Sequence, residues 1–508
     1  MNNVEVYVEV YNTYFLIGVV RKFFYFDILN YLKENLSYYK QGYQYTPSFK
    51  NGSWDGKVYL FSTITTKDER YFNKSYFKIE IGFLDKILNF FNDRKILFKV
   101  IDKTKKHENI INKELKWVGK ELRDYQKEAI NNLLNNRIGI VSLPTGSGKM
   151  LLGAYLIYSL KYKVVLVVRN LESVIQTKNE IEESIENVKV GVWVTNYKDV
   201  ENSDVIITTF NSLNQSIKSK NELYRIVSEF DCILVDEAHH ISNNIFKKII
   251  KYFNFYYIYG MTGTAYRNDK SDLELNGIFG DVVYKKNVKD LQIDNFLSDS
   301  EIFFVRVDKF ELDKENFVKD FPGETYLTFS SVNKLDSNNL YKLGIVYNKC
   351  RNNIISNALS VYKGKKILIL VKYIYHGNLL SRIFRVPFIS GVSSKKKRTE
   401  ILNKFRFENL NVLIASTIYD ESVNIPELEV LINATGHSSI ISQIQRHGRV
   451  IRKTKNKEKA IFIDFYDEFD RRVLKHTKKR ISSMEKEGLE PIIINRLDKQ
   501  TDEISVIF

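Results

Sequence analysis

Short, unbroken runs of apolar residues alternate with helical patterns through the middle and the last part of the chain. In the middle, the runs cover residues 139–141, 164–168, 205–209, 232–235 and 256–259. The same rhythm returns at residues 366–371, 412–415, 430–434 and 460–465. Runs without polar alternation are typical of strands buried on both faces, as in parallel sheets covered by helices. The pattern therefore predicts an α/β fold with two parallel-sheet domains in tandem.

The first 115 residues follow a different pattern and are rich in aromatic and basic residues. Residues 4–10 and 15–20 are expected to be strands, and residues 26–36 and 84–91 have helical spacing. Most of the rings must form the core of a small α+β domain. Trp54 is the candidate for a surface ring on which a base stacks, and its alternative is a place in that core. We therefore expect domains at 1–115, 116–297 and 298–508.

The charge balance favours a polyanionic partner. The chain has 508 residues, with 77 Lys and Arg against 61 Asp and Glu, a net charge of +16. Such an excess favours nucleic acid first and an anionic surface second. Two cysteines cannot build a disulfide framework or a cysteine zinc site, and no secretion signal or membrane-spanning run is evident. We expect a soluble cytoplasmic protein with no membrane partner.

A glycine-rich loop stands between an apolar strand and the helical pattern of residues 151–160. Its residues are Pro144, Thr145, Gly146, Ser147, Gly148, Lys149 and Met150. Glycines let backbone N–H groups face a phosphate, and the following helix N-terminus adds positive potential. Lys149 would reach the β- and γ-phosphates of a nucleotide. The loop predicts ATP binding.

Met150 departs from the usual form of such a loop, which has Ser or Thr at this position. The hydroxyl normally ligates Mg²⁺, whereas a thioether is a poor ligand for a hard cation. Either other ligands and waters hold the metal, or hydrolysis is weakened, and the sequence leaves both open.

Two adjacent carboxylates, Asp236 and Glu237, end the apolar run 232–235. In α/β sheets this carboxyl edge is where ligands bind. Asp236 is predicted to hold Mg²⁺, directly or through water, and Glu237 to orient and deprotonate the attacking water. An isolated acidic pair would more often cap a helix, but this one follows a phosphate loop.

With these two elements, the chain resembles the superfamily-two helicases and translocases from about residue 121 to 480, including the Asp-Glu-Ala-His form of residues 236–239. The resemblance implies two RecA-like motor domains after the small α+β domain. It assigns Arg123 and Gln126 to adenine recognition, Thr208, Thr209 and Phe210 to nucleic-acid contact, and Thr262, Gly263 and Thr264 to coupling of hydrolysis with movement.

In the second motor domain, the same resemblance assigns nucleic-acid contacts to Gly391, Ser416 and Thr417. Gln445, Arg449 and Arg452 match the sixth motif, whose arginines would act as fingers on the γ-phosphate. Ser422 replaces a usual glycine, and Arg169-Asn170 replace a common Pro-Thr pair, where we assign no contact.

Within the superfamily, the chain most resembles the phage recombination helicases of the UvsW type, and more loosely the XPB and RecG groups. Residues 260–267, the tail 464–467 with the basic helix 471–480, and residues 54–57 carry this resemblance. It implies an ATP- and Mg²⁺-dependent helicase that remodels branched or forked DNA. We expect a monomer, located in the host cytoplasm if the source is viral. Protein partners stay unknown.

Three alternatives stay open. An RNA helicase would use the same backbone-gripping motifs. A restriction-system motor subunit often carries a Pro-Asp nuclease motif, and none of the six prolines here precedes Asp. An ATP-binding clamp without hydrolysis is supported only by Met150 and Ser422.

Overall fold

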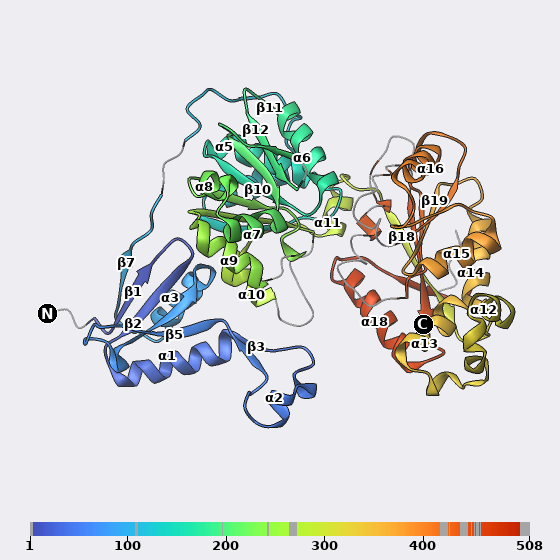
Figure 1. Cartoon of the computed structure of the whole chain (residues 1–508), viewed down its shortest axis with the longest axis horizontal. Coiled ribbons are helices and arrows are strands. Elements are labelled where there is room, and N and C mark those ends of the chain that lie inside the picture. Colours follow the sequence, from blue (N-terminus) through green and yellow to red (C-terminus); the bar gives the residue numbers. More distant parts are fainter. Residues whose placement is uncertain are drawn as a thin grey trace. The chain divides into compact units, whose positions relative to one another are not determined.

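The computed structural model describes residues 4–106, 110–195, 197–240, 243–263, 272–416, 425, 427–436, 446–448, 450–451, 453, 457 and 459–497. The chain forms two compact units (Figure 1). The first contains the residues up to Leu143 and Gly148–Lys285, and the second contains Pro144–Ser147 and the residues from Lys286 onward. In the described part of the chain, no helix is long and apolar enough to cross a membrane.

The first unit begins with the predicted α+β domain, a five-stranded sheet in the order β5-β6-β2-β1-β7. Its strands are β1 (Val6–Val10), β2 (Tyr14–Val19), β5 (Phe61–Thr65), β6 (Ser75–Glu80) and β7 (Phe98–Asp102). Helices α1 (Lys22–Asn35) and α3 (Leu84–Asp93) contribute apolar side chains to the core of this sheet. Alternate residues of β1 are buried, as expected for a strand with one face on a core.

A small hairpin projects from this domain after α1. It consists of β3 (Ser37–Tyr39), paired antiparallel with β4 (Lys57–Tyr59), and the short helix α2 (Pro47–Lys50) between them (Figure 1). The hairpin holds several rings outside the main core, and it carries Trp54.

The second part of the first unit is an eight-stranded sheet in the order β13-β12-β14-β10-β15-β16-β9-β17. The strands are β9 (Ile138–Ser142), β10 (Val164–Val168), β12 (Val190–Val194), β13 (Tyr197–Asp199), β14 (Val205–Thr209), β15 (Cys232–Val235), β16 (Tyr257–Thr262) and β17 (Val282–Lys285). All neighbours pair in parallel except β12 and β13. The predicted first parallel sheet is confirmed.

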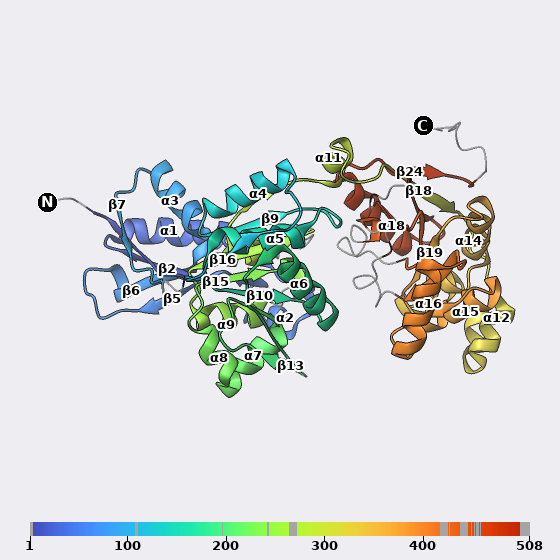
Figure 2. The ribbon, with the colours of Figure 1, turned by 90° about the horizontal axis from the view of Figure 1, so that it is seen from above.

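Helices cover both faces of this sheet. The helix α4 (Asp124–Leu134) lies on one side, and α7 (Phe210–Ser219) and α9 (Asn243–Phe253) lie on the other (Figure 2). The central strands β10 and β15 are fully buried, which explains their unbroken apolar sequences. The helices α5 (Lys149–Leu160) and α6 (Leu171–Ser184) follow β9 and β10 in the chain.

Polar contacts join the small domain to this sheet within the first unit. The Asn12 side-chain amide donates to the carbonyl of Asn254 at 2.8 Å, and Arg137 Nη1 donates to the carbonyl of Asn12 at 3.0 Å. Gly82 packs against backbone atoms of α10 (Asp272–Phe279) so closely that an added Cβ would clash. These contacts fix the small domain on the first sheet.

The second unit contains a seven-stranded, all-parallel sheet in the order β20-β21-β19-β22-β23-β18-β24. The strands are β18 (Ser300–Val307), β19 (Ile367–Val371), β20 (Phe388–Ile389), β21 (Val412–Ser416), β22 (Val430–Asn433), β23 (Ala460–Asp467) and β24 (Ile492–Ile494). Among its helices are α14 (Lys349–Val361), α15 (Ile374–Phe384), α16 (Lys395–Phe407) and α18 (Arg471–Glu485). The predicted tandem arrangement is therefore confirmed.

Candidate nucleotide-binding site

The candidate chemistry gathers at one edge of the first sheet. The strands β10, β15, β16 and β9 are neighbours and run parallel. Their carboxyl ends therefore meet at the same edge, which is the ligand-binding edge of open α/β sheets. The residues at or just after those ends are Arg169, Asp236, Thr262, Gly263 and Leu143.

The glycine-rich loop begins two residues after the end of β9 and leads into α5. Gly146 and Gly148 have φ values of 88° and 79°, in the left-handed region that favours glycine. Lys149 is the first residue of α5, and its ammonium donates to the carbonyl of Leu143 at 3.1 Å. The same ammonium lies 3.7 Å from Glu237 Oε1. Lys149 is thus positioned between the loop and the acidic pair.

Gln126 lies directly against the loop. Its side chain is buried, accepting a hydrogen bond from the Arg123 N–H at 3.0 Å and donating to the carbonyl of Gly148 at 3.4 Å. A Cβ added to Gly148 would stand 2.7 Å from Gln126 Nε2. Arg123 is exposed and contacts the Tyr125 hydroxyl at 3.1 Å. The structure therefore brings both predicted adenine-recognition residues to the start of α4, beside the loop.

The acidic pair follows β15. The Asp236 N–H donates to the carbonyl of Val167 in the neighbouring strand at 3.0 Å, and Glu237 adopts a left-handed φ of 48°. Burial, together with the negative charge of Glu237, raises the pKa of Asp236 to about 7, and Lys149 acts in the opposite direction. Two adjacent carboxylates at this edge favour the binding of a cation, which could also contact a nucleotide phosphate.

A divalent cation would need oxygen ligands from a nucleotide as well as from the protein. Among the described residues, no group of three or more His, Cys, Asp or Glu side chains could hold a metal. Mg²⁺ commonly binds through one or two carboxylates plus substrate phosphates and waters. Asp236 fits that mode of binding, because it combines an oxygen donor with a nearby phosphate-binding lysine.

Met150 turns its thioether toward α6. The buried hydroxyl of Thr177 donates to Met150 Sδ at 3.4 Å. The side chain is half-buried, so the methionine fills space between α5 and α6. It supplies no oxygen to a cation, and the hydroxyl that does lie nearby belongs to Thr177.

The predicted coupling segment contacts the acidic pair. His239 Nδ1 lies 2.7 Å from Thr262 Oγ1 and 3.3 Å from Glu237 Oε2, and both His239 and Thr262 are buried. The Gly263 N–H donates to Glu237 Oε2 at 3.4 Å. The carbonyl of Thr262 accepts from the Leu143 N–H at 2.9 Å, just before the loop. Thr262 thus connects Glu237, through His239, to the strand end that precedes the phosphate loop.

The predicted nucleic-acid residues of the first sheet differ in their environment. Thr208 is fully buried, and its hydroxyl donates to the carbonyl of Trp193 at 2.8 Å. Thr209 caps α7, accepting from the Ser212 N–H at 3.3 Å, and Phe210 packs beside Phe246. In this arrangement the Thr208 hydroxyl serves the fold, and Thr209, which is half-buried, caps α7 at the carboxyl end of β14.

In the second unit, Ser416 ends β21 and is buried, whereas Gly391 is exposed in the turn after β20. The remaining predicted residues lie outside the described residues: Thr264, Thr417, Gln445, Arg449 and Arg452. Arg446, within the predicted sixth motif, is buried and donates to Asn433 Oδ1 at 3.1 Å and to Thr435 Oγ1 at 2.8 Å.

Trp54 occupies the projecting hairpin and is half-buried. Its indole N–H donates to the carbonyl of Lys57 at 2.8 Å, so the ring closes the turn before β4. Two tyrosines of the hairpin are more open to solvent, Tyr45 at 79% exposure and Tyr39 at 53%. The Lys57 ammonium lies 5.3 Å from the centroid of the Tyr39 ring.

Sequence reasoning assigned no role to Arg169, which the structure places near the acidic pair. Desolvation lowers the pKa of Arg169, and the charge of Glu237 opposes that effect, which indicates that the two groups interact. Its position directly after β10, the neighbour of β15, which Asp236 follows, is the signal that could have identified it. His239 was likewise part of the quoted motif without an assigned role.

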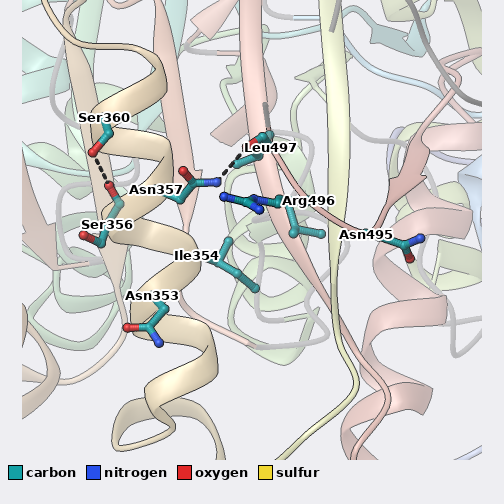
Figure 3. A pocket seen from close by; sticks show the side chains of 9 residues that line it. Asn353, Ile354, Ser356, Asn357, Ser360, Asn495, Arg496 and Leu497 are labelled. Carbon is teal, nitrogen blue, oxygen red and sulfur yellow. Dashed lines mark hydrogen bonds between the residues drawn. The ribbon is translucent and has the colours of Figure 1, made fainter. Parts of the chain in front are cut away.

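The described chain also contains a cavity away from the residues discussed above. It has a volume of about 480 Å³ and is formed in the second unit by α14 and the segment after β24 (Figure 3). The Asn357 side chain crosses it and donates to the carbonyl of Leu497 at 2.7 Å. None of the predicted nucleotide-site residues lines this cavity, so the candidate nucleotide site is identified by the chemistry at the sheet edge.

A glycine loop with a lysine, followed by adjacent carboxylates at the carboxyl edge of a parallel sheet, defines the class of P-loop nucleotide-binding proteins. Three family models match the chain. "Type III restriction enzyme, res subunit" covers residues 119–267, "Helicase conserved C-terminal domain" covers 350–454, and "DNA helicase UvsW, N-terminal" covers 17–68. Together the three cover more than half of the chain.

Curated relatives agree with these domains. The chain is 27% identical over 369 residues to the DNA 3'-5' translocase XPB2 of Sulfurisphaera tokodaii, covering 68% of this chain and 81% of that protein. It is 27% identical over 368 residues to the general transcription and DNA repair factor IIH helicase/translocase subunit XPB of Enterocytozoon bieneusi. That second match covers 68% of this chain and 58% of the relative.

Two solved structures are also similar. The Type ISP restriction-modification enzyme LlaBIII bound to DNA matches 72% of this chain and 30% of its own, at 16% identity and a TM-score of 0.51, which shows the fold alone. The UvsW protein of bacteriophage T4 matches 96% of this chain and 99% of its own, at 18% identity and a TM-score of 0.44. The family models and the curated relatives together support a superfamily-two DNA helicase of the UvsW and XPB type, a class of ATP-driven enzymes.

Proposed function

We propose that this chain hydrolyses ATP with Mg²⁺ to move along DNA and to remodel branched or forked DNA. One observation carries the proposal: at a single sheet edge, Glu237 contacts both Lys149 and His239, and His239 contacts Thr262, with Asp236 next to Glu237 in the chain. A phosphate-binding group, a metal ligand, a water-activating base and a coupling residue are therefore adjacent.

The residues divide the hydrolysis between them. Lys149 neutralises phosphate charge, and Asp236 holds Mg²⁺, which when bound adds further charge neutralisation at the phosphates. Glu237 orients the attacking water and accepts its proton. The Gly263 N–H and His239 fix one oxygen of Glu237, leaving the other toward Lys149. Arg449 and Arg452 are proposed to complete the site when ATP is bound.

The same carboxylate contacts offer a route from hydrolysis to movement. Any shift of Glu237 during the reaction acts on His239 and Thr262, and Thr262 is bonded to the strand end that precedes the phosphate loop. The second parallel sheet is proposed to grip the nucleic-acid backbone in alternation with the first, through Gly391, Ser416 and Thr417.

The small domain supports the preference for branched DNA. It is fixed to the first sheet by Asn12 and Arg137, so a junction held by its hairpin would feel the motor directly. Exposed rings next to a lysine, as at Tyr39 and Lys57, are suited to stacking on unpaired bases. We propose that the protein works as a monomer in the cytoplasm.

The test is ATP hydrolysis by the purified chain in Mg²⁺, alone and with single-stranded DNA, forked DNA or RNA. Stimulation is expected to be strongest with forked DNA, and unwinding of the fork should require hydrolysable ATP. Glu237→Gln is expected to keep ATP binding and to lower turnover by about 10²- to 10⁴-fold, because general-base catalysis is lost. Equal stimulation by RNA, or unaltered turnover in Glu237→Gln, would overturn the proposal.

A further inference from the structure

The helix α18 (Arg471–Glu485) in the second unit has a basic, solvent-exposed face to which the proposed function assigns no role. A groove of about 400 Å³ runs along it. The residues that line this groove are Arg471, Leu474, Lys475, Lys478, Lys479 and Ser482. We call this surface the α18 groove. It belongs to none of the motifs used in the hydrolysis cycle.

Helical geometry gathers these charges on one side. Arg471, Lys475, Lys478, Lys479 and Ser482 follow one another at i, i+4, i+7, i+8 and i+11, which is one face of an α-helix. All five are exposed to solvent. The groove contains four cations and no carboxylate, so its potential is positive throughout.

The lysines are not engaged in structural contacts. Within the described part of the chain, the side chains of Lys475, Lys478 and Lys479 have no hydrogen bond or ion pair. The positive charge of these lysines also affects the neighbouring His476. Burial is the main cause that lowers the pKa of His476, and the charges of Arg480, Lys479 and Lys475 lower it further. Clustered like charges without counter-ions oppose folding slightly, and a bound anion would remove that cost.

The opposite face of α18 is firmly anchored. Arg480 is fully buried, with Nε 3.1 Å from Asp464 Oδ2 and Nη2 donating to the carbonyl of Phe465 at 2.8 Å. Thr477, Ser483 and Met484 are buried on the same face. The helix therefore presents its lysines from a fixed backbone, and only side-chain rotations remain to be ordered on binding.

We infer that the α18 groove binds the phosphodiester backbone of DNA, as a surface additional to the motor motifs. This inference rests on the proposed function, in which DNA is the substrate. Along the helix axis, Lys475 and Lys479 are about 6 Å apart, at 1.5 Å per residue. Successive phosphates of one strand of duplex DNA advance about 3.4 Å along its axis, so the two lysines match phosphates about two apart.

The residues that line the groove also indicate that it does not recognise the base sequence of DNA. Leu474 and Ser482 are its only uncharged members, and no amide or aromatic side chain lines it to recognise a base edge. Lysine acts on phosphate as a point charge without demanding one orientation. Binding is therefore independent of sequence and strongly dependent on salt.

The test compares two triple variants of the full chain. Lys475→Ala/Lys478→Ala/Lys479→Ala removes the groove lysines, and alanine is favourable in a helix, so α18 should persist. The matched control is a second triple variant in the same unit, outside the groove: Lys314→Ala, Lys319→Ala and Lys363→Ala. Both lose three exposed positive charges. Circular dichroism checks that each variant is folded.

The measurement is equilibrium binding of a fluorescent forked DNA without ATP, between 50 and 300 mM salt. We expect the groove variant to lower affinity about tenfold or more at 0.1 M salt and to reduce the slope of log K against log salt by about 3. The control should bind like the wild type. Equal loss in both variants would overturn the inference, because net charge would then explain it, and so would unchanged binding in the groove variant.

Failure of the proposed function gives a different pattern. If the wild-type chain neither binds DNA nor shows DNA-stimulated hydrolysis, the proposed function fails and the groove loses its substrate. If the wild type does both but the groove variant binds DNA as tightly as the wild type, the inference fails and the proposed function stands. Preferential binding of the groove to phosphatidylserine vesicles, with no change in DNA affinity, would also overturn it.

Discussion

The contact between the Thr262 hydroxyl and His239, which in turn contacts Glu237, allows a test of the proposed coupling of hydrolysis to movement. Thr262→Val replaces the hydroxyl with a methyl group of similar size and leaves the backbone bond from Leu143 in place. It removes the 2.7 Å contact to His239 Nδ1. Both side chains are buried, so water cannot readily replace the lost partner.

The magnitude follows from that burial. Leaving a buried polar group without its partner costs about 1–3 kcal/mol. His239 Nδ1 keeps Glu237 Oε2 at 3.3 Å, which places the expected cost near the lower end of the range. If the cost falls on the transition state, turnover decreases about 5- to 20-fold. Fork unwinding should fall further, because the link from Glu237 to Thr262 is broken while the catalytic carboxylates remain.

The assay measures DNA-stimulated ATP hydrolysis and fork unwinding on the same preparation, and the ratio of base pairs opened to ATP consumed. Thr262→Ser is the matched control, since it retains the hydroxyl, and its ratio should equal that of the wild type. The reasoning is refuted if Thr262→Val lowers both rates by one common factor, or if Thr262→Ser is impaired as strongly as Thr262→Val.

Three further predictions concern the metal site and the buried core. Met150→Thr restores a hydroxyl oxygen at the start of α5 and should lower the Mg²⁺ concentration needed for half-maximal hydrolysis severalfold, as a Mg²⁺ titration will show. Asp236→Asn should abolish Mg²⁺-dependent hydrolysis. Because the pKa of Asp236 is raised to about 7 from 3.8, the folded state holds this proton more tightly, and the stability it contributes is lost as pH rises from about 4 to 7. Without metal, Asp236→Asn should therefore melt higher than the wild type at pH 8, and the difference should shrink at pH 5. Arg480→Met leaves the buried Asp464 without its cation and should cost about 3–5 kcal/mol in denaturant unfolding, with partial recovery in Asp464→Leu/Arg480→Met.

The sequence was sufficient for the parts of the fold whose signals are local. The unbroken run Val164–Val168 and the loop that ends in Lys149 identify a buried strand and a phosphate site without any knowledge of neighbours. The strand β18 (Ser300–Val307) was not predicted from the sequence. Its place between β23 and β24 depends on pairing with strands far along the chain, of which β23 lies about 160 positions later.

Side-chain environments at the site were less accessible to sequence reasoning. The Thr208 hydroxyl is taken by Trp193, a partner from β12 that only the sheet order brings beside β14. The Thr177 hydroxyl near Met150 likewise comes from a helix 27 residues later in the chain. The roles of Arg449 and Arg452 stay predictions, because these residues lie outside those described.

A chain of buried polar contacts relates the α18 groove to the segment of the sixth motif. Arg480 of α18 contacts Asp464, and Asp464 accepts a hydrogen bond from Asn433 at 2.8 Å. Asn433 in turn accepts from Arg446, three residues before the predicted finger Arg449. Because each of the four side chains is buried and shares a partner with the next, a change at one end alters the pairing of the whole set. Arg480→Met should therefore reduce DNA-stimulated hydrolysis even at temperatures where the variant is folded, whereas loss of stability alone would leave the folded fraction fully active.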